Sequence, residues 1–431
     1  MTTTLAAATE LGREGPALRR GPLLVAAAIS VAAIALRMQV GRRQAALFLV
    51  GALAGVVLYH AAFGFTSAWR VLIVERRGAG LRAQLLMFAA TCGVFFPLLA
   101  AGTVFGQAIR GAVAPAGVAV AAGAFIFGVG MQLAGGCASG TLYSAGGGSP
   151  RMLVVLGAFV AGSVLGTAHA PWWAALPAWS PVSLVAIWGP WRAMAVSLLL
   201  FATIAVASVA LERARHGRLA QVGPEAPTWL RGPWPLAAGA LGLAIVNVAT
   251  LVIAGRPWGV TSAFALWGAK LLLVAGVPVE TWPYWTTPAQ AAALRTSVAA
   301  DVTSVMDAGI LLGALLASFL AGRFAPVWRV PRRSLAAALL GGILLGYGAR
   351  AAYGCNIGAC FSGIASGSLH GWLWLAAAFA GNAVGTRLRP FFGLSVERSA
   401  QASQGATPRP RLQGATGCER SPIHSGAESR G

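Results

Sequence analysis

Apolar stretches of about twenty residues recur along the whole chain, and they restrict it to a helical fold in a membrane. A helix needs about 20 apolar residues to cross the hydrocarbon core. Of the 431 residues, 57% are hydrophobic and 10% are charged, whereas about 25% are charged in a soluble domain. The sequence predicts an all-α polytopic membrane protein with about ten spans, near 22–38, 44–63, 81–104, 112–134, 151–170, 193–211, 234–254, 299–322, 335–353 and 371–388.

Two segments need a separate interpretation. Residues 263–278 are apolar but short, which fits either an eleventh span or a broken helix. The N-terminus is basic and continues into an apolar run from Pro22 to Leu36, as in a signal peptide. No small-x-small cleavage pattern follows this run, so we expect a first span that is retained.

Arginines in alternate loops predict the orientation of the chain. They gather in 70–82, 212–231, 323–333 and after the last span, and positive loops stay in the cytoplasm. The organisation we expect is a cytoplasmic tail, a first membrane half, a cytoplasmic linker, a second membrane half and a disordered C-terminal tail, at 1–21, 22–211, 212–231, 232–390 and 391–431. The net charge of +21 is then explained by orientation and by the anionic lipid bilayer, and no nucleic acid partner is expected.

One short motif occurs twice, once in each predicted half. Gly-Cys-x-x-Gly stands at 136–140 and at 354–358, in a glycine-rich stretch between apolar segments. Gly-x-Gly precedes both copies at the same spacing, at 128–130 and 346–348, and a serine follows each. The residues that the motif contributes to a candidate site are Gly136, Cys137, Ser139, Gly140, Gly354, Cys355, Asn356 and Gly358.

A second pair of similar segments supports the duplication. Thr66 and Ser67 lie in Gly-Phe-Thr-Ser-Ala, and Thr261 and Ser262 lie in Gly-Val-Thr-Ser-Ala, each after an apolar span. Matching spans lie five apart, and because five is odd the halves face opposite ways, which is an inverted repeat. Irregular glycine-rich backbone cannot face lipid, so we expect re-entrant Gly-Cys loops and short half-helices that fold inward.

The residue types in these loops suit a soft anion. A thiol is polarizable and matches sulfur or selenium better than phosphate oxygen. The hydroxyls of Ser139, Thr141, Ser144 and Ser362, together with Asn356, suit the oxygens of an oxyanion, and helix N-termini favour its charge. Cys360 and Arg350 join the candidates, and Asp307 is a further intramembrane charge that pairs with Arg350 or carries a proton. Cys92, in the middle of a span, is expected to be a packed residue.

Catalytic chemistry has little support in the sequence. The five cysteines include no C-x-x-C pair and the five histidines have no ligand spacing. We therefore expect no metal and no cofactor. Neither Gly-Cys loop contains a general base, which favours transport over an enzyme.

Over roughly residues 44–390 the chain resembles the YeeE/YedE family of membrane proteins, described as sulfur transport proteins. The similarity is carried by the segments 128–140 and 346–372. It implies a bacterial inner-membrane protein that takes up thiosulfate or a related species past cysteines, at positions that match Cys137 and Cys355. Relatives commonly carry another cysteine where this chain has Gly64.

The resulting expectation is a transporter for a small sulfur-containing anion, most simply thiosulfate. Two alternatives stay open, which are a permease for a selenium species or other soft anion and a membrane thiol sulfurtransferase. The sequence contains no fused sulfurtransferase domain, so a sulfur-carrier partner, if there is one, is expected to be a separate cytoplasmic protein.

Overall fold

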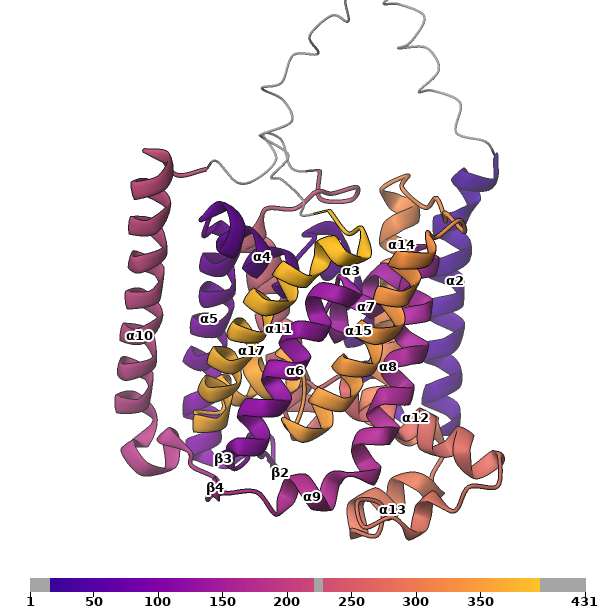
Figure 1. The fold of residues 1–431 in the computed structure, drawn as a ribbon. Helices are drawn as coiled ribbons and strands as arrows, with labels where there is room; N and C mark the ends of the chain where they lie inside the picture. Colours follow the sequence, from indigo (N-terminus) through magenta and orange to yellow (C-terminus); the bar gives the residue numbers. More distant parts are fainter. Residues whose placement is uncertain (1–15, 221–227, 396–431) are drawn as a thin grey trace, which may run out of the picture. The chain divides into compact units, whose positions relative to one another are not determined.

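Long helices make up most of the protein (Figure 1). The computed structural model describes residues 16–220 and 228–395, and these belong to one unit, Met1–Val396. Within them, ten helices have 17 residues or more: α2 Pro16–Gln39, α3 Arg42–His60, α5 Ala79–Ala101, α6 Val118–Ala134, α8 Pro150–Ala168, α10 Leu184–His216, α11 Leu236–Ala254, α14 Val302–Leu320, α15 Arg332–Ala351 and α17 Leu369–Leu388.

The prediction of an all-α polytopic membrane protein is confirmed. Nine helices of the described chain are long and apolar enough to cross a membrane. The helix α17 is of similar length but is not among them, because polar residues such as His370 and Asn382 lower its hydropathy. The first helix, α2, begins at Pro16, so it includes the end of the predicted tail 1–21, whose residues 1–15 lie outside the described chain.

Short elements connect the long helices. Residues 263–278 do not form an eleventh span, because α12 ends after 14 residues. Two strand pairs are antiparallel, β1 Thr103–Val104 with β2 Gln107–Ala108 and β3 Ala116–Gly117 with β4 Ala178–Trp179. The short helices are α4 Phe65–Glu75, α7 Ala138–Gly146, α9 Ala170–Ala174, α12 Thr261–Val274, η2 Val279–Thr281, α13 Pro288–Arg295, η3 Val298–Ala300, the π-helix η4 Asn356–Phe361, α16 Ser362–Ala365 and η5 Arg389–Phe392.

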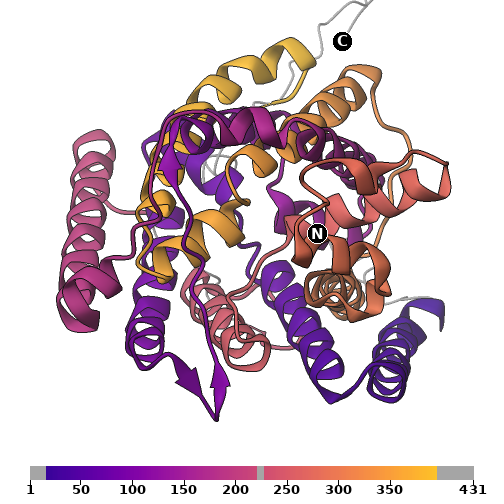
Figure 2. The same cartoon turned by 90° about the horizontal axis from the view of Figure 1, so that it is seen from below.

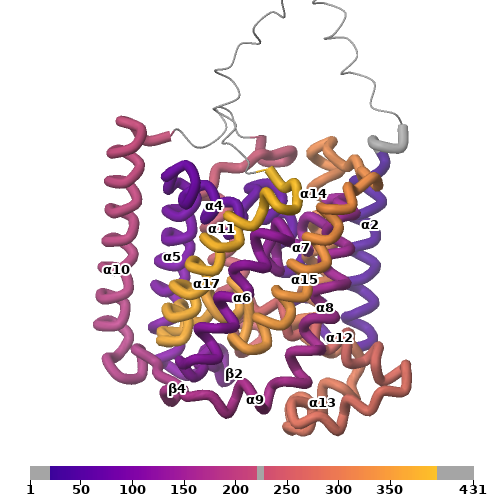
Figure 3. Tube along the Cα trace, in the orientation of Figure 1, coloured from indigo at the N-terminus to yellow at the C-terminus, as the bar shows by residue number. Residues whose placement is uncertain are grey.

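Helix packing repeats between the two halves of the chain. The pair α6 and α17 corresponds to the pair α15 and α8, and the pair α3 and α14 corresponds to α11 and α5. In the same way α2 packs on α14 where α10 packs on α5. Corresponding helices run in opposite senses, as α2 and α10 show most clearly (Figures 1 and 3). The fold is therefore an inverted repeat.

The centre and the periphery of the bundle differ in burial. The helix α6 contacts its counterpart α15, and α3 contacts its counterpart α11. Two helices of the first half therefore pack directly on the equivalent helices of the second half. The helices α2 and α10 stand at the outside, as the view from below shows (Figure 2). Only 17% of the most apolar window of either helix is buried. These two helices are the ones that mainly face lipid.

The duplicated Gly-x-Gly motif serves helix packing. A Cβ atom on Gly128 of α6 would lie 2.2 Å from the carbonyl oxygen of Ala378 in α17. Its counterpart Gly346 of α15 meets the carbonyl oxygen of Phe159 in α8 at the same 2.2 Å. Small residues let membrane helices approach this closely, so the spacing of Gly-x-Gly reflects the repeat and not a binding loop.

The ends of the two halves lie on one side of the bundle. The start of α2, the end of α10 and η5 are all at the top of Figure 1. The predicted linker 212–231 begins inside α10, which continues to His216 because Glu212 is bound by Arg82 at 2.9 Å and accepts from the Gly78 and Ala220 amides. Residues 221–227 of the linker and 396–431 of the predicted tail lie outside the described chain.

Candidate functional site

Each Gly-Cys loop ends on the first turn of a short buried helix. Cys137 is the residue before α7 and Cys355 is the residue before η4. Their exposed fractions are 2% and 1%. The helices α7 and η4 contact each other, and Cys355 lies within electrostatic range of Cys137. The structure therefore brings together two cysteines that are 218 positions apart in the numbering of the sequence.

The first loop is regular and internally bonded. The Sγ atom of Cys137 lies 3.4 Å from the Oγ atom of Ser139. The Cys137 carbonyl accepts from the backbone and side chain of Thr141, at 2.8 and 2.9 Å. A Cβ atom on Gly140 would lie 3.5 Å from the Cys137 sulfur, so a side chain at this position would contact the thiol.

The second loop is wound differently and leaves polar atoms unused. The amides of Ala359 and Cys360 both donate to the Cys355 carbonyl, at 2.9 and 3.2 Å, in a π-helical turn. Gly354 has φ +146°, a conformation that favours glycine. Asn356 is fully buried, and neither its amide nitrogen nor its amide oxygen has a hydrogen-bond partner among the described residues. π-turns with unpaired polar groups often mark functional positions.

A pair of equivalent contacts links these loops to the short helices α4 and α12. In the second half Arg350 donates to the Thr261 hydroxyl at 2.8 Å. In the first half Gln132, the counterpart of Arg350, donates to the Thr66 carbonyl at 3.1 Å. Gln132 is also held by Arg70 and Asn382, at 3.1 and 2.6 Å. The same position thus carries a cation in one half and a fixed amide in the other.

A pocket of about 420 Å³ opens beside the second loop, and we call it the arginine pocket. Gly354 and Gly358, which flank Cys355, form part of its wall. Three arginines line the pocket, Arg110, Arg256 and Arg350, and none of them forms an ion pair with another residue of the described ranges 16–220 and 228–395. Its other lining residues are Gly111, Ala112, Pro257, Trp258, Gly259, Val260, Thr261, Ser262 and Tyr353.

The charges of the arginine pocket are poorly compensated. Burial lowers the pKa of the Arg256 guanidinium, and the neighbouring Asp301 partly reverses this shift. Arg256 donates to the Thr303 hydroxyl at 3.1 Å, and Arg350 donates to the Tyr284 hydroxyl at 3.3 Å. Cations bonded to neutral groups in a partly dry site attract an anion.

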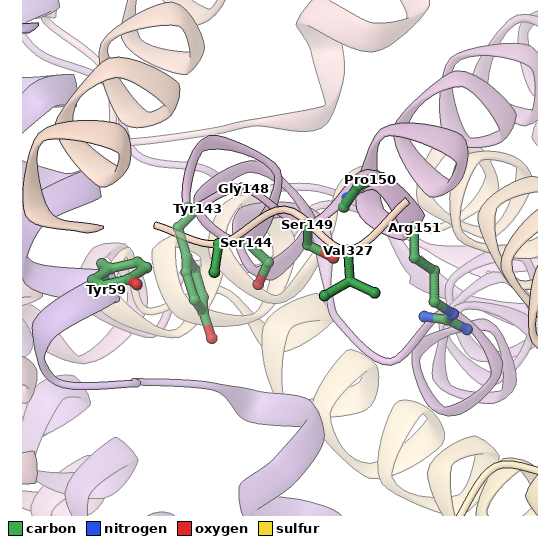
Figure 4. A pocket seen from close by; sticks show the side chains of 10 residues that line it. Tyr59, Tyr143, Ser144, Gly148, Ser149, Pro150, Arg151 and Val327 are labelled. Carbon is green, nitrogen blue, oxygen red and sulfur yellow. The ribbon is translucent and has the colours of Figure 1, made fainter. Parts of the chain in front are cut away.

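A second pocket of about 330 Å³ lies beside the C-terminal end of α7, and we call it the tyrosine pocket (Figure 4). Tyr59, Tyr143 and Ser144 line one part of it, and Arg151 lines another. Arg151 donates to the carbonyl oxygens of Ala134 and Leu133, so its charge caps the end of α6. The remaining lining residues are Gly147, Gly148, Ser149, Pro150, Ala325 and Val327.

Neither thiol lines a pocket described above. The arginine pocket reaches the glycines around Cys355, and the tyrosine pocket reaches the far end of the helix that begins after Cys137. The two Gly-Cys loops therefore lie between the arginine pocket and the tyrosine pocket. In this structure neither thiol reaches either pocket.

Several predicted residues have other partners. The Ser362 hydroxyl donates to the Trp258 carbonyl at 2.7 Å and accepts from Asn247 at 3.2 Å, so it links the second Gly-Cys segment to the connection after α11. Ser262 bonds to Thr303 at 3.0 Å, and the Ser67 hydroxyl bonds to the Gly64 carbonyl at 3.4 Å. Cys360 is buried and does not line the arginine pocket.

Other members of the site were missed by sequence reasoning. Arg110 and Arg256 line the arginine pocket, and Tyr59 and Tyr143 line the tyrosine pocket. The signal for Arg256 was its place between a span and the Trp-Gly-Val-Thr-Ser segment. Across the described residues, no group of three or more His, Cys, Asp and Glu side chains forms a candidate metal site.

Comparisons with known proteins agree on one family. The sulphur transport family matches residues 60–384. The probable transporter YedE of Salmonella typhimurium is 32% identical over 188 residues, which are 42% of this chain and 45% of that protein. The chain thus matches less than half the length of that relative. The thiosulfate transporter TsuA of Escherichia coli is 25% identical over 76% of this chain and 89% of that protein. TsuA of Spirochaeta thermophila is 26% identical over 75% and 92%. With the family match covering most of its length, this chain belongs to the sulphur transport family.

Proposed function

We propose that this protein carries a small sulfur-containing anion, most simply thiosulfate, across the bacterial inner membrane. The observation that carries the proposal is the arginine pocket, in which three arginines share the lining with the glycines that flank Cys355. A cationic pocket selects an anion, and a thiol behind it favours a soft sulfur atom over a hard oxygen. The names of the TsuA relatives point to the same substrate.

The order of contacts follows from the geometry. Arg350, Arg256 and Arg110 would collect the anion, and Thr261 and the glycine backbone would receive its oxygens. Asn356 follows Cys355 in the sequence, and its side-chain NH2 group, which has no acceptor among the described residues, would donate to the anion. The substrate sulfur would then contact Cys355 and Cys137 in turn and leave past Tyr143 and Ser144. No covalent bond forms or breaks in this scheme.

The arginine distribution supports one orientation. The side of the bundle that holds the start of α2 and η5 also holds the arginine-rich loops 70–82 and 323–333. By the positive-inside rule this side is cytoplasmic, which puts both ends of the described chain inside. The short helices α4, α7, α12 and η4 would then belong to re-entrant segments, the arginine pocket would open outward, and a separate sulfur-carrier protein would meet the cytoplasmic side.

Uptake of labelled thiosulfate into cells that express Cys137→Ala or Cys355→Ala tests the proposal. We expect both variants to lose uptake, because each removes one soft contact. The matched control is Cys92→Ala, since Cys92 is also fully buried but belongs to neither Gly-Cys loop, and its thiol donates to the Ile364 carbonyl at 3.9 Å. Undiminished uptake by both loop variants would sink the mechanism.

Two further measurements separate the alternatives. Competition with a selenium-containing anion distinguishes a selenium permease from a thiosulfate carrier, and sulfate, which has no exposed soft atom, serves as the negative competitor. Mass spectrometry of Cys137 and Cys355 after exposure to substrate distinguishes a sulfurtransferase, which would leave a persulfide on one of them.

A further inference from the structure

Asp307 is a fully buried carboxyl group that the proposed transport path does not use. It lies in α14, one helical turn beyond Thr303, and its exposed fraction is 0%. Neither side-chain oxygen has a hydrogen-bond partner among the described residues. Cys355 lies within electrostatic range of it. A buried carboxyl group without a partner, on a helix that packs against α7, requires an explanation.

The neighbouring charges do not supply a partner. The helix α14 packs on α2, α3, α7, α12 and η3. Asp301, at the start of α14, is itself acidic and accepts from the Ser304 amide and hydroxyl, both at 2.7 Å. Lys270 of α12 donates to the carbonyl oxygens of Leu294 and Thr296. The other charged or titratable groups on these elements and beside the helix are Arg20, Arg37, Arg42, Arg43, Tyr59, His60, Cys137, Tyr143, Arg256 and Cys355.

Burial determines whether the Asp307 carboxyl group is charged or neutral. An unpaired carboxylate is far less favourable in a dry interior than in water, and a second acidic group, Asp301, adds repulsion. The neutral carboxylic acid avoids both penalties and has one O–H donor to offer. A donor of this kind binds an anion, whereas the carboxylate would repel it.

We infer that Asp307 loads a proton that crosses the membrane together with the sulfur anion, which makes the transporter a proton symporter. This inference rests on the proposed function. The Asp307 O–H donates to an oxygen of the anion beside Cys355, and the proton leaves with the anion. The Asp307 carboxylate that remains takes up a proton from the solution on the entry side before the next anion binds.

The test uses the full-length protein in proteoliposomes, with labelled thiosulfate and with the membrane potential clamped at zero. With one proton per anion, a gradient of one pH unit, acidic on the uptake side, gives about tenfold accumulation in the wild type. The variant Asp307→Asn keeps the size of the side chain but cannot exchange a proton. It should equilibrate thiosulfate without accumulating it and should still exchange internal for external thiosulfate.

The control is Glu280→Gln, since Glu280 is an exposed acidic residue of η2 that lines neither pocket, and this variant should accumulate thiosulfate as the wild type does. Infrared spectra of the purified protein add a readout without substrate, because the band of a protonated carboxylic acid should vanish in Asp307→Asn. Accumulation that ignores the pH gradient, gradient-driven accumulation by Asp307→Asn, or unchanged infrared spectra would each overturn the inference. Failure of the proposed function looks different, since the wild type would then show neither accumulation nor exchange.

Discussion

The two thiol loops share a position in the fold and differ in chemistry. In the first, Gln132 is fixed by Arg70 and Asn382, and Cys137 contacts Ser139. In the second, the equivalent Arg350 faces the arginine pocket, and Asn356 keeps two unused polar atoms. The repeat determines where the loops lie. Their divergence turns an arginine toward a pocket in the second half, whereas the equivalent amide in the first half is held by its own hydrogen bonds.

The largest effect on the two halves is expected from a methyl group added where their helices cross, because it should reduce the stability of the fold. Gly346→Ala and Gly128→Ala each place a Cβ atom against a carbonyl oxygen of the facing helix. Overpacking of this kind reduces stability by about 1–3 kcal/mol. We expect both variants to lower the melting temperature in detergent by similar amounts.

The control for these glycines is Gly93→Ala, because nothing lies within 4 Å of the new Cβ atom. A clearly unequal loss in the two glycine variants would show that the halves are not equivalent in packing.

Making the second loop resemble the first should weaken substrate capture. Arg350→Gln removes one cation from the arginine pocket but retains donors for Thr261. We expect KM for thiosulfate to rise about tenfold, as a loss of about 1.4 kcal/mol implies, and the salt dependence of uptake to become weaker. Arg295→Gln is the control, since Arg295 is exposed and does not line the pocket. Equal effects of both variants would assign the change to surface charge in general.

Removal of the Asn356 side-chain amide should weaken substrate binding without reducing the stability of the protein. Asn356→Ala deletes a buried polar group that has no partner in the described structure, so the melting temperature should stay the same or rise. The KM for thiosulfate should rise about fivefold, the value of one hydrogen bond of about 1 kcal/mol.

Asn247→Ala gives the opposite pattern and serves as its control. Asn247 accepts from the Trp258 amide at 2.9 Å and donates to Ser362, so its loss should lower the melting temperature. A destabilised Asn356→Ala with unchanged KM would mean that this amide is structural.

The smallest effect is expected at Gly64, where the family resemblance implies a further cysteine. A Cβ atom on Gly64 would lie 3.0 Å from the Ser67 hydroxyl and 3.9 Å from the Tyr143 hydroxyl. A small shift of Ser67 accommodates it, so Gly64→Cys should fold and transport much like the wild type. Labelling with a membrane-impermeant thiol reagent from each side would show which pocket the new thiol reaches. Severe loss of expression would contradict this account.

The fold was largely predictable from the sequence, because apolar length and a duplicated motif are local signals. The segments around Cys137 and Cys355 repeat at matching positions, and their odd separation in spans gave the inverted orientation. The arginine pocket was not predictable, since Arg110 and Arg256 come from two separate connections and Arg350 comes from the last turn of α15. The role of Ser362 was also hidden, because its bond to Trp258 depends on how two distant loops meet. Asn356 was found as a candidate, but its unpaired state appears only once the π-turn is seen.

The burial of both thiols has a consequence for their lifetime in the cell. In the proposed orientation the protein borders an oxidising compartment, where an accessible pair of cysteines is converted to a disulfide or a sulfenic acid. Exposed fractions of 1–2% protect Cys137 and Cys355 from that damage without any reductant. Each passage of substrate would then uncover the thiols only briefly. The rate at which a small oxidant inactivates the protein would thus measure how often the path opens.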